Sequence, residues 1–212
     1  MKNNYLLLSI IILLISSSLQ AQTKAVTETG EEVILYTDGT WKYLNQEEEI
    51  EKEITTNPVT FEKSEKSTFL LKSNSTKLGF WLNPKKWSFK KGVNNDDAEY
   101  ELQLRGEDLY AIIITEKVEI PLESFKELAL ENGREIAPDI QVVKEEYRMV
   151  NGLKMLLMQM DGTMQGIKIS YYGYYFSNEE GSVQFLAYTS QNLLEEYKPV
   201  AEELLNGIVI TE

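Results

Sequence analysis

The 212-residue sequence predicts an α+β fold: an antiparallel β-sheet of about six strands packed with two helices and preceded by a small N-terminal β-hairpin unit. Two observations carry this prediction. Four consecutive β-type runs between residues 141 and 189 are joined by tight turns, which only an antiparallel meander accommodates. Two further segments, at 122–132 and 192–206, show the apolar spacing of amphipathic helices.

The first 21 residues are typical of a secretory signal peptide. Lys2 supplies the positive charge, an apolar run follows from Tyr5 to Ile15, and Ala21 suits cleavage. The run is too short to span a bilayer, which needs about 20 residues. We therefore expect an exported protein, periplasmic or secreted, with no membrane span after signal cleavage. An uncleaved membrane anchor is the alternative.

Residues 22–45 are expected to form the small β unit. Two short extended runs, Lys24–Thr29 and Glu32–Thr37, precede Asp38-Gly39, a hairpin signal that leads into Thr40–Leu44. One face of this unit would hold Val33, Leu35, Trp41 and Tyr43. A unit of this size buries little apolar surface on its own. We therefore expect it to dock on another surface or to bind a partner.

Residues 46–67 are predicted to be an acidic linker, because this stretch holds seven Glu against three Lys and has few apolar groups. Such a composition cannot offset the entropy of ordering the chain. A solvated spacer is the favoured interpretation, and an acidic docking or cation-binding tract is the alternative.

Residues 68–212 have the length of one domain with a sizeable core. The strands expected first are Thr68–Lys72, Leu78–Leu82, Trp87–Lys90, Ala98–Leu104 and Leu109–Val118. A helix follows from about Leu122, with Ser124 and Glu127 as a capping box and Gly133 as its stop. The meander then turns at Asn151-Gly152, at 162–166 and at 178–181. A last helix containing Pro199 and a short strand at 208–210 complete the domain.

This order of elements, headed by Phe80-Trp81-Leu82-Asn83-Pro84-Lys85-Lys86-Trp87, resembles the PsbP-like superfamily. The resemblance covers residues 68–212 and rests on the order of the elements and on the Pro84/Trp87 spacing. Within that superfamily, the chain is similar to the exported DcrB-like proteins. It implies a non-enzymatic binding or assembly role in an exported or peripheral protein. No metal or partner site is carried over from the family.

Composition excludes several chemistries. The chain has no His and no Cys, which removes Ser/His/Asp and Cys/His triads, His-ligated metals, thiolate nucleophiles and disulfides. A net charge of −13 disfavours nucleic acid and anionic membranes as partners. We therefore expect a non-catalytic protein with no cofactor, whose partner is an unknown envelope or extracellular protein.

Aromatic residues are the candidates for binding. In the run 170–176, Tyr171 and Tyr175 share one face with Gly173, whereas Tyr172, Tyr174 and Phe176 share the other. A core strand with phenols reaching the rim is the favoured interpretation, and an open aromatic binding face is the alternative. Trp81 and Trp87 fall at strand ends near Pro84, where they would be core lids or, alternatively, ligand-stacking residues.

Carboxylates give two alternative functions from other classes. The loop residues Asn94, Asn95, Asp96, Asp97 and Glu99 could form a weak calcium site, although the EF-hand spacing is absent and a turn is favoured. Asp161 ends an apolar strand and is the best candidate acid of a glycan hydrolase that uses two carboxylates. Its place before Gly162 favours a structural role. We assign no catalytic and no metal residue.

Overall fold

The computed structural model describes residues 23–27, 30, 32–36, 39–44, 53–92 and 97–211. Its chain divides into two units, Met1–Glu53 and Ile54–Glu212. The predicted signal peptide at 1–21 and residues 46–52 of the predicted linker lie outside the described residues. No described helix is long and apolar enough to cross a membrane.

The first unit contains a three-stranded antiparallel sheet. Its strands are β1 (Thr23–Val26), β2 (Glu32–Leu35) and β3 (Trp41–Tyr43), in that order. The register pairs Val33 with Tyr43 and Leu35 with Trp41, so Val33, Leu35 and Trp41 share the expected face. Val33 is buried, whereas Trp41 and Val26 are exposed. This small sheet therefore leaves apolar surface uncovered within its own unit.

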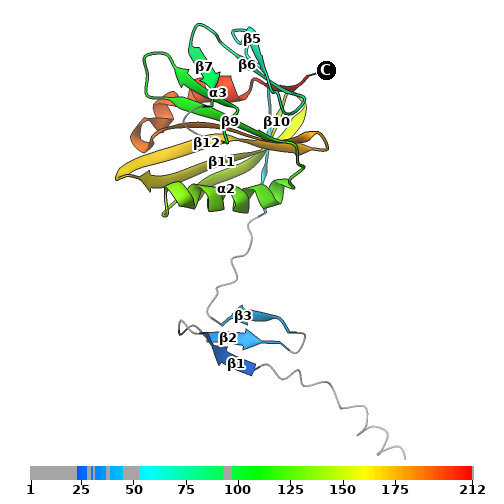
Figure 1. Ribbon diagram of the computed structural model, residues 1–212, viewed down its shortest axis with the longest axis vertical. Helices are drawn as coiled ribbons and strands as arrows, with labels where there is room; N and C mark the ends of the chain where they lie inside the picture. The colour runs from blue at the N-terminus through cyan, green and yellow to red at the C-terminus, as the bar shows by residue number, and fades with distance from the viewer. Residues whose placement is uncertain are drawn as a thin grey trace, which may run out of the picture. The chain divides into compact units, whose positions relative to one another are not determined.

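The second unit is built on an eight-stranded sheet (Figure 1). Its strands, in spatial order, are β4 (Thr56–Phe61), β10 (Gln141–Val150), β11 (Leu153–Met164), β12 (Ile167–Asn178), β13 (Gly181–Ser190), β9 (Tyr110–Glu116), β8 (Tyr100–Leu104) and β7 (Trp87–Lys91). Every neighbouring pair is antiparallel except β4 and β10, which are parallel. The predicted α+β class is confirmed, and the sheet is larger than the six strands expected.

Strand β4 corrects the predicted linker. Residues 56–61 lie within 46–67, yet they extend the sheet by pairing in parallel with β10. Phe61 packs against the core, and the Arg148 guanidinium lies 4.4 Å from the centroid of its ring. Pro58 is tolerated because β4 is an edge strand, where a missing N–H costs no ladder bond. The linker was predicted from its charge and its few apolar groups, and this criterion does not detect a single aromatic residue that packs against the core. The linker prediction is therefore wrong for residues 56–61.

A second layer covers one face of the main sheet. It consists of the sheet β14-β6-β5, made of β5 (Phe69–Lys72), β6 (Leu78–Leu82) and β14 (Ile208–Ile210), together with α3 (Leu194–Leu205) and the preceding 3-10 turn η1 (Gln191–Leu193). Helix α2 (Leu122–Ile136) lies on the opposite face (Figure 1). The buried residues accordingly form two clusters, one on each side of the main sheet. Because both faces of the main sheet are covered, its central strands carry apolar or aromatic side chains on both sides.

Two hairpin turns fix the register of the meander. Asn151 and Gly152 have φ of 50° and 81°, the positive values that a type I′ turn requires, as the Asn-Gly signal predicts. Gln165 and Gly166 have φ of 51° and 82° and turn β11 into β12 in the same way. Because the turn lies at these two residues, β11 continues through Gly162 instead of ending there.

Helix α2 begins and ends differently from the expectation. Its N-cap is Pro121 and it has no side-chain cap, so the predicted capping box of Ser124 and Glu127 is absent. The helix also runs past Gly133 to Ile136. A Cβ atom on Gly133 would lie 2.9 Å from Cδ1 of Ile140, so this glycine serves close packing rather than helix termination.

Gly207 is a position where a methyl group has no room. Its carbonyl accepts a hydrogen bond from the Trp81 backbone N–H at 2.8 Å, and an added Cβ would lie 1.9 Å from the Trp81 carbonyl oxygen. We expect Gly207→Ala to lower the free energy of unfolding by about 3 kcal/mol, at the upper end for overpacking. Equilibrium urea unfolding measures this.

The control for Gly207→Ala is Gly106→Ala. Gly106 has φ of 77° and open space around its Cβ position, so this substitution isolates backbone strain from steric overlap. We expect it to cost about 1 kcal/mol. A loss at Gly207 no greater than the loss at Gly106 would contradict the packing argument.

Candidate ligand-binding cleft

The aromatic strand β12 is covered on both faces. Tyr172, Tyr174 and Phe176 face α3 and the second layer, while Tyr171 and Tyr175 face α2, which is the predicted alternation. The side chains of Tyr172, Tyr174 and Tyr175 are 0% exposed and that of Phe176 is 6% exposed. An open aromatic binding face is therefore wrong for these four residues, since helices and strands pack on both sides. Tyr171 remains partly exposed.

The two tryptophans also belong to the packing of the domain. Trp87 is 2% exposed and lies within the core, so it is not available for ligand stacking. Trp81 is half-buried, and the ammonium nitrogen of Lys63 lies 5.1 Å from its ring centroid. The favoured expectation of a core lid describes Trp87, whereas Trp81 lies outside both core clusters.

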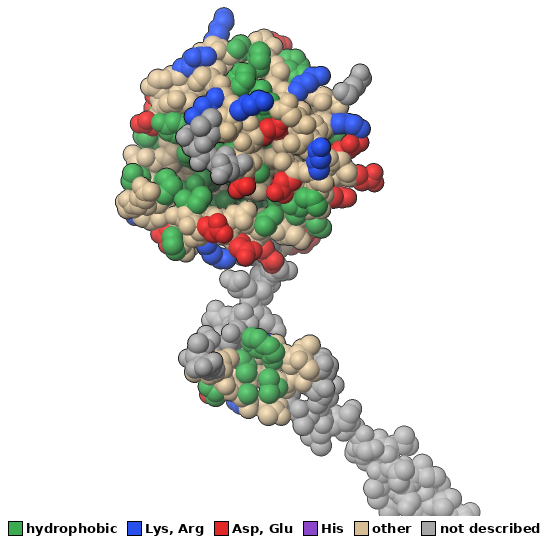
Figure 2. All heavy atoms as spheres, viewed as in Figure 1, with side chains coloured by type: hydrophobic (Ala, Val, Ile, Leu, Met, Phe, Trp, Pro, Cys, Tyr) green, Lys and Arg blue, Asp and Glu red, His purple; other side chains and the backbone are tan. Residues whose placement is uncertain are grey.

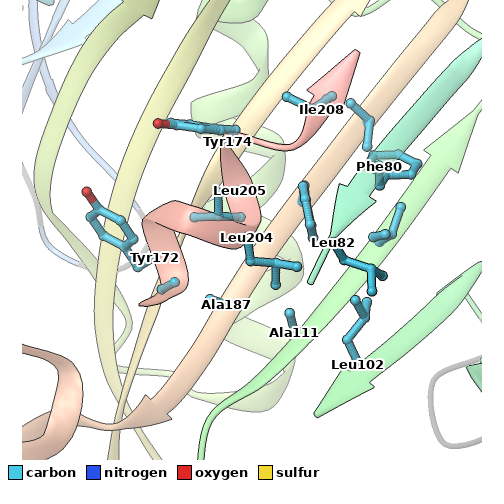
Figure 3. Packing of buried hydrophobic residues seen from close by; sticks show 14 of the residues in the cluster. Phe80, Leu82, Leu102, Ala111, Tyr172, Tyr174, Ala187, Leu204, Leu205 and Ile208 are labelled. Atoms are coloured by element: carbon cyan, nitrogen blue, oxygen red, sulfur yellow. The ribbon is translucent and has the colours of Figure 1, made fainter. Parts of the chain in front are cut away.

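The phenols of Tyr172 and Tyr174 take part in a structural network at the edge of α3. Figure 3 shows both rings beside α3, with their hydroxyl groups directed away from Leu204 and Leu205. The Tyr172 hydroxyl donates to Glu202 Oε1 at 2.5 Å, and the Tyr174 hydroxyl donates to Asn206 Oδ1 at 2.8 Å. These bonds tie β12 to α3 and fully occupy the phenols that the sequence left as binding candidates.

Arg148 on β10 is the cation of this network. It is 4% exposed, and its Nη1 donates to Glu202 Oε1 at 2.8 Å and to the Tyr174 hydroxyl at 3.2 Å. Its Nε donates to Glu146 Oε1 at 2.6 Å. A buried guanidinium needs such partners, because an unpaired buried charge is strongly unfavourable. The network is therefore a stabilising element rather than a free site.

Acid should weaken this network. Burial alone would raise the pKa of Glu202, but hydrogen bonds from Tyr172 and Arg148 lower it below its ordinary value of 4.5. A carboxyl whose pKa is lower in the folded chain than in the unfolded chain adds stability above that value, and the stability is lost as the pH falls. We expect the free energy of unfolding to decrease from about pH 5 downward.

Urea unfolding at a series of pH values tests this expectation. Glu202→Gln removes the titrating group, so it should flatten the acid limb relative to Glu195→Gln, which lies on the exposed side of the same helix. Acid limbs of equal slope in the two variants would show that Glu202 does not contribute.

Asp161 has the surroundings of a structural carboxylate. It accepts hydrogen bonds from Ser170 Oγ at 2.6 Å, Gln191 Nε2 at 2.6 Å and Gln159 Nε2 at 3.4 Å. These three donors are neutral, whereas a glycosidase acid works beside a second carboxylate. Asp161 thus joins β11, β12 and η1.

The acidic loop that was considered as a weak calcium site is described only in part, and its described carboxylate Glu99 also has a structural role. Residues 94–96 lie outside the described residues. Glu99 accepts hydrogen bonds from Ser73 Oγ at 2.8 Å, Asn74 Nδ2 at 2.9 Å and Thr115 Oγ1 at 2.5 Å, and so holds the loop that follows β5. Within the described ranges, no group of three or more Asp or Glu residues is placed to hold a metal ion.

A cleft of about 620 Å³ lies between α2 and the main sheet. Helix α2 packs over β11 and β12, so part of the neighbouring surface on β13 and β9 stays open. Ile112, Leu186 and Tyr188 line the cleft from the strands, and Ala129 and Ile136 line it from the helix. In Figure 2, hydrophobic and acidic side chains share the lower part of the visible face of this domain, on the side where α2 lies. We call this site the α2 cleft.

Tyr175 is the most deeply buried tyrosine among the residues that line the α2 cleft. Tyr175 is 0% exposed, its ring packs 5.6 Å from that of Phe125, and its hydroxyl has no hydrogen-bond partner. An unsatisfied buried polar group costs about 1–3 kcal/mol. Burial raises the pKa of Tyr175, so the phenol is neutral at physiological pH.

Two residues of the lining, Tyr171 and Tyr188, belong to a row of three neighbouring tyrosines. The register places Tyr171, Tyr188 and Tyr110 side by side on β12, β13 and β9. The Tyr171 and Tyr188 ring centroids are 5.6 Å apart, and those of Tyr188 and Tyr110 are 5.5 Å apart and stacked. Of the sequence candidates, the cleft collects Tyr171 and Tyr175. Tyr188 was missed because only cross-strand register brings it there.

No protein-family model matches the chain, and no curated protein matches it. Among solved structures, it is similar to cyanobacterial PsbP (CyanoP) from Synechocystis sp. PCC 6803, with 11% identity and a TM-score of 0.49 over 69% of this chain and 94% of that one. It is also similar to PA94, a protein of unknown function from Pseudomonas aeruginosa (12% identity, TM-score 0.44, 66% and 95% coverage). A third similar structure is LpqN, involved in cell envelope biogenesis of Mycobacterium tuberculosis (9%, 0.37, 95% and 97%).

Proposed function

We propose that this protein is an exported, non-catalytic binding protein whose ligand occupies the α2 cleft. The observation that carries the proposal is a cleft of about 620 Å³ that is lined mainly by aliphatic and aromatic residues, among them Tyr171, Tyr175 and Tyr188. Small-ligand sites combine this size with an apolar lining and a few polar groups.

The sequence supports two parts of the proposal, namely export and the lack of catalysis. The signal-like segment at 1–21 supports action in the envelope or outside the cell, where the partner would also be found. The absence of His and Cys removes the commonest bases and nucleophiles, and the surroundings of Asp161 supply neutral partners. Binding is therefore the function that the cleft supports best.

A fluorescence titration with Nile red, a neutral apolar dye, tests the cleft in the chain lacking residues 1–21. Ile136 lines the cleft and its side chain is 51% exposed, so Ile136→Trp should fill the site without disturbing the core. Val59→Trp is the control, because Val59 is 56% exposed and lies on β4, at the edge of the sheet.

We expect the wild type and Val59→Trp to bind the dye equally and Ile136→Trp to bind it about tenfold more weakly, a difference of about 1.4 kcal/mol. No dye binding to the wild type, or equal binding by all three proteins, would show that the cleft is not a ligand site.

A further inference from the structure

We propose that the edge of the domain formed by β5 and β7 docks on the surface of an anionic phospholipid membrane. This surface consists of an exposed pair of phenylalanines and the exposed lysines around it. We call it the basic edge, and its residues are Phe69, Phe89, Lys66, Lys72, Lys85 and Lys91. The proposal goes beyond the proposed function, because β5 belongs to the second layer, on the face of the main sheet opposite to α2 and its cleft.

Charge is distributed unevenly along the chain. The whole chain has a net charge of −13, and this bulk value disfavours an anionic membrane. Residues 66–92, which contain β5, β6 and β7, nevertheless hold seven Lys and no Asp, Glu or Arg. In Figure 2, most of the visible Lys and Arg side chains lie over the upper part of this domain, where Figure 1 places these strands. The local charge governs contact with a surface, because salt screens charges that lie more than about 10 Å away.

Carboxylates from other parts of the domain neutralise only part of this charge. Three of the seven lysines form ion pairs, namely Lys77 with Glu180 (2.5 Å), Lys86 with Glu203 (2.8 Å) and Lys90 with Glu101 (3.0 Å). Glu65, which precedes Lys66, and Glu99, which holds the loop after β5, add two more carboxylates. Within the described ranges, the four lysines of the basic edge form no ion pair, and all four are exposed. Seven lysines beside five carboxylates leave this edge positive.

Two phenylalanines form the apolar centre of the basic edge. Phe69 on β5 and Phe89 on β7 are each 40% exposed, and their ring centroids are 5.3 Å apart. The ring of Tyr100 on β8 lies behind them, with its centroid 6.3 Å from that of Phe89. Exposed apolar groups that are rimmed by polar residues mark interaction sites. The pair is therefore available to an apolar phase outside the domain.

Two lysines adjoin the apolar centre at one end. The register places Lys91 opposite Tyr100, and the Tyr100 hydroxyl donates to the Lys72 carbonyl oxygen at 2.9 Å. Lys91 also lies two residues after Phe89, so both share one face of β7. One aromatic residue thus connects the backbones that carry these two exposed ammonium groups.

The other two lysines lie toward the opposite end of β5. Lys66 precedes Phe69 by three residues, and Lys85 lies in the turn that follows Leu82, the register partner of Phe69. Lysines therefore flank the aromatic rings at both ends. This arrangement lets ammonium groups contact lipid head groups while the rings enter the boundary with the acyl chains.

The lack of Arg in residues 66–92 favours a membrane over an acidic protein segment. The planar guanidinium of Arg recognises a carboxylate through two parallel hydrogen bonds, whereas the ammonium of Lys acts as a mobile point charge. A bilayer that contains anionic lipids presents a diffuse negative potential, which attracts lysines without a fixed geometry. Export, as the sequence predicts, would bring the domain to the membrane surfaces of the envelope.

Cosedimentation with lipid vesicles tests the proposal, with the chain lacking residues 1–21. Vesicles of equal parts phosphatidylcholine and phosphatidylglycerol are compared with vesicles of phosphatidylcholine alone. We expect partitioning onto the anionic vesicles to be at least about tenfold stronger at low salt. Raising the NaCl concentration from about 50 mM to about 500 mM should remove most of this preference, because the Debye length shortens.

Substitutions of lysines test the electrostatic part. Lys72→Gln/Lys91→Gln should lower partitioning onto the anionic vesicles by about fivefold or more. The control is Lys144→Gln/Lys168→Gln, which changes the net charge equally; both residues are exposed and lie outside residues 66–92, on β10 and β12. The control should keep at least about half of the wild-type partitioning.

Substitutions of the rings test the apolar part. Phe69→Ala/Phe89→Ala should lower partitioning onto the anionic vesicles by about tenfold, because little apolar surface is left to enter the bilayer. Val143→Ala/Ile167→Ala is the control, since these residues are 47% and 57% exposed and lie on β10 and β12. Urea unfolding of each variant verifies that it is folded.

The outcomes decide between a membrane and other partners. Equal binding to anionic and neutral vesicles, or equal losses in the two lysine variants, would overturn the proposal. If the phenylalanine substitutions leave partitioning unchanged and an oligoglutamate peptide binds as tightly as the anionic vesicles, the basic edge fits an acidic protein segment, and the assignment of a membrane is overturned. Nile red binding without vesicles should be unchanged in every variant, so failure of the basic edge and failure of the α2 cleft are distinguishable.

Discussion

Replacing Arg148 by alanine is expected to lower the free energy of unfolding by about 3–5 kcal/mol, the cost of removing one partner from a buried ion pair. Arg148 is 4% exposed and donates to Glu146, Glu202 and the Tyr174 hydroxyl. Without it, the two carboxylates and the phenol lose their buried cationic partner. The guanidinium also covers the ring of Phe61, so the substitution should loosen β4 as well.

Urea unfolding, followed by far-UV circular dichroism, measures the Arg148 effect. The control is Lys77→Ala, which breaks the ion pair with Glu180; both of these side chains are at least half exposed. An exposed pair of this kind is worth up to about 1 kcal/mol. Hydrogen exchange of the β4 amides would report the loosening of the edge strand. Similar losses in Arg148→Ala and Lys77→Ala would refute the role assigned to burial.

The second large effect is expected at Phe125. Helix α2 has two buried residues, Phe125 and Ala129, and Phe125 is 0% exposed against the ring of Tyr175. Phe125→Ala removes most of the apolar surface that α2 buries and leaves a cavity above β12. We expect a loss of about 3–5 kcal/mol in the free energy of unfolding.

Ile136→Ala is the matched control for Phe125, since Ile136 lies on the same helix but is 51% exposed. Its expected cost is below about 1 kcal/mol, as for most exposed substitutions. Benzene binding to Phe125→Ala would reveal a dry cavity directly. A Phe125→Ala protein as stable as Ile136→Ala would mean that α2 is held mainly by other contacts.

Local patterns in the sequence predict the strands and their faces well. Period-two alternation places Tyr172 and Tyr174 opposite Tyr175, and Asn151-Gly152 predicts the turn between β10 and β11. Both patterns depend only on residues that lie within a few positions of one another in the chain. The covering of each face depends instead on α2 and α3, which are distant in the chain. For that reason the exposure of the aromatic strand could not be derived from its own residues.

The residues of the α2 cleft are even harder to predict from local sequence patterns. Tyr171 and Tyr188 come together through the pairing of β12 with β13, and Ile136 is added by a helix that extends one turn beyond its expected end. No local spacing relates these three positions. Strand β4 was missed for a different reason: its pairing is parallel and its partner lies far along the chain.

The position of β4 has a consequence for the order of folding. Its partner β10 follows roughly 90 residues later in the chain, so closing this pair carries a large loop entropy. Contacts of such long range form late, and until then the β10 edge is unpaired. An unpaired edge invites association with other chains, which charged side chains oppose. Lys144, Glu145 and Glu146 lie on β10, so the growing domain carries its own protection against aggregation at an edge that closes late.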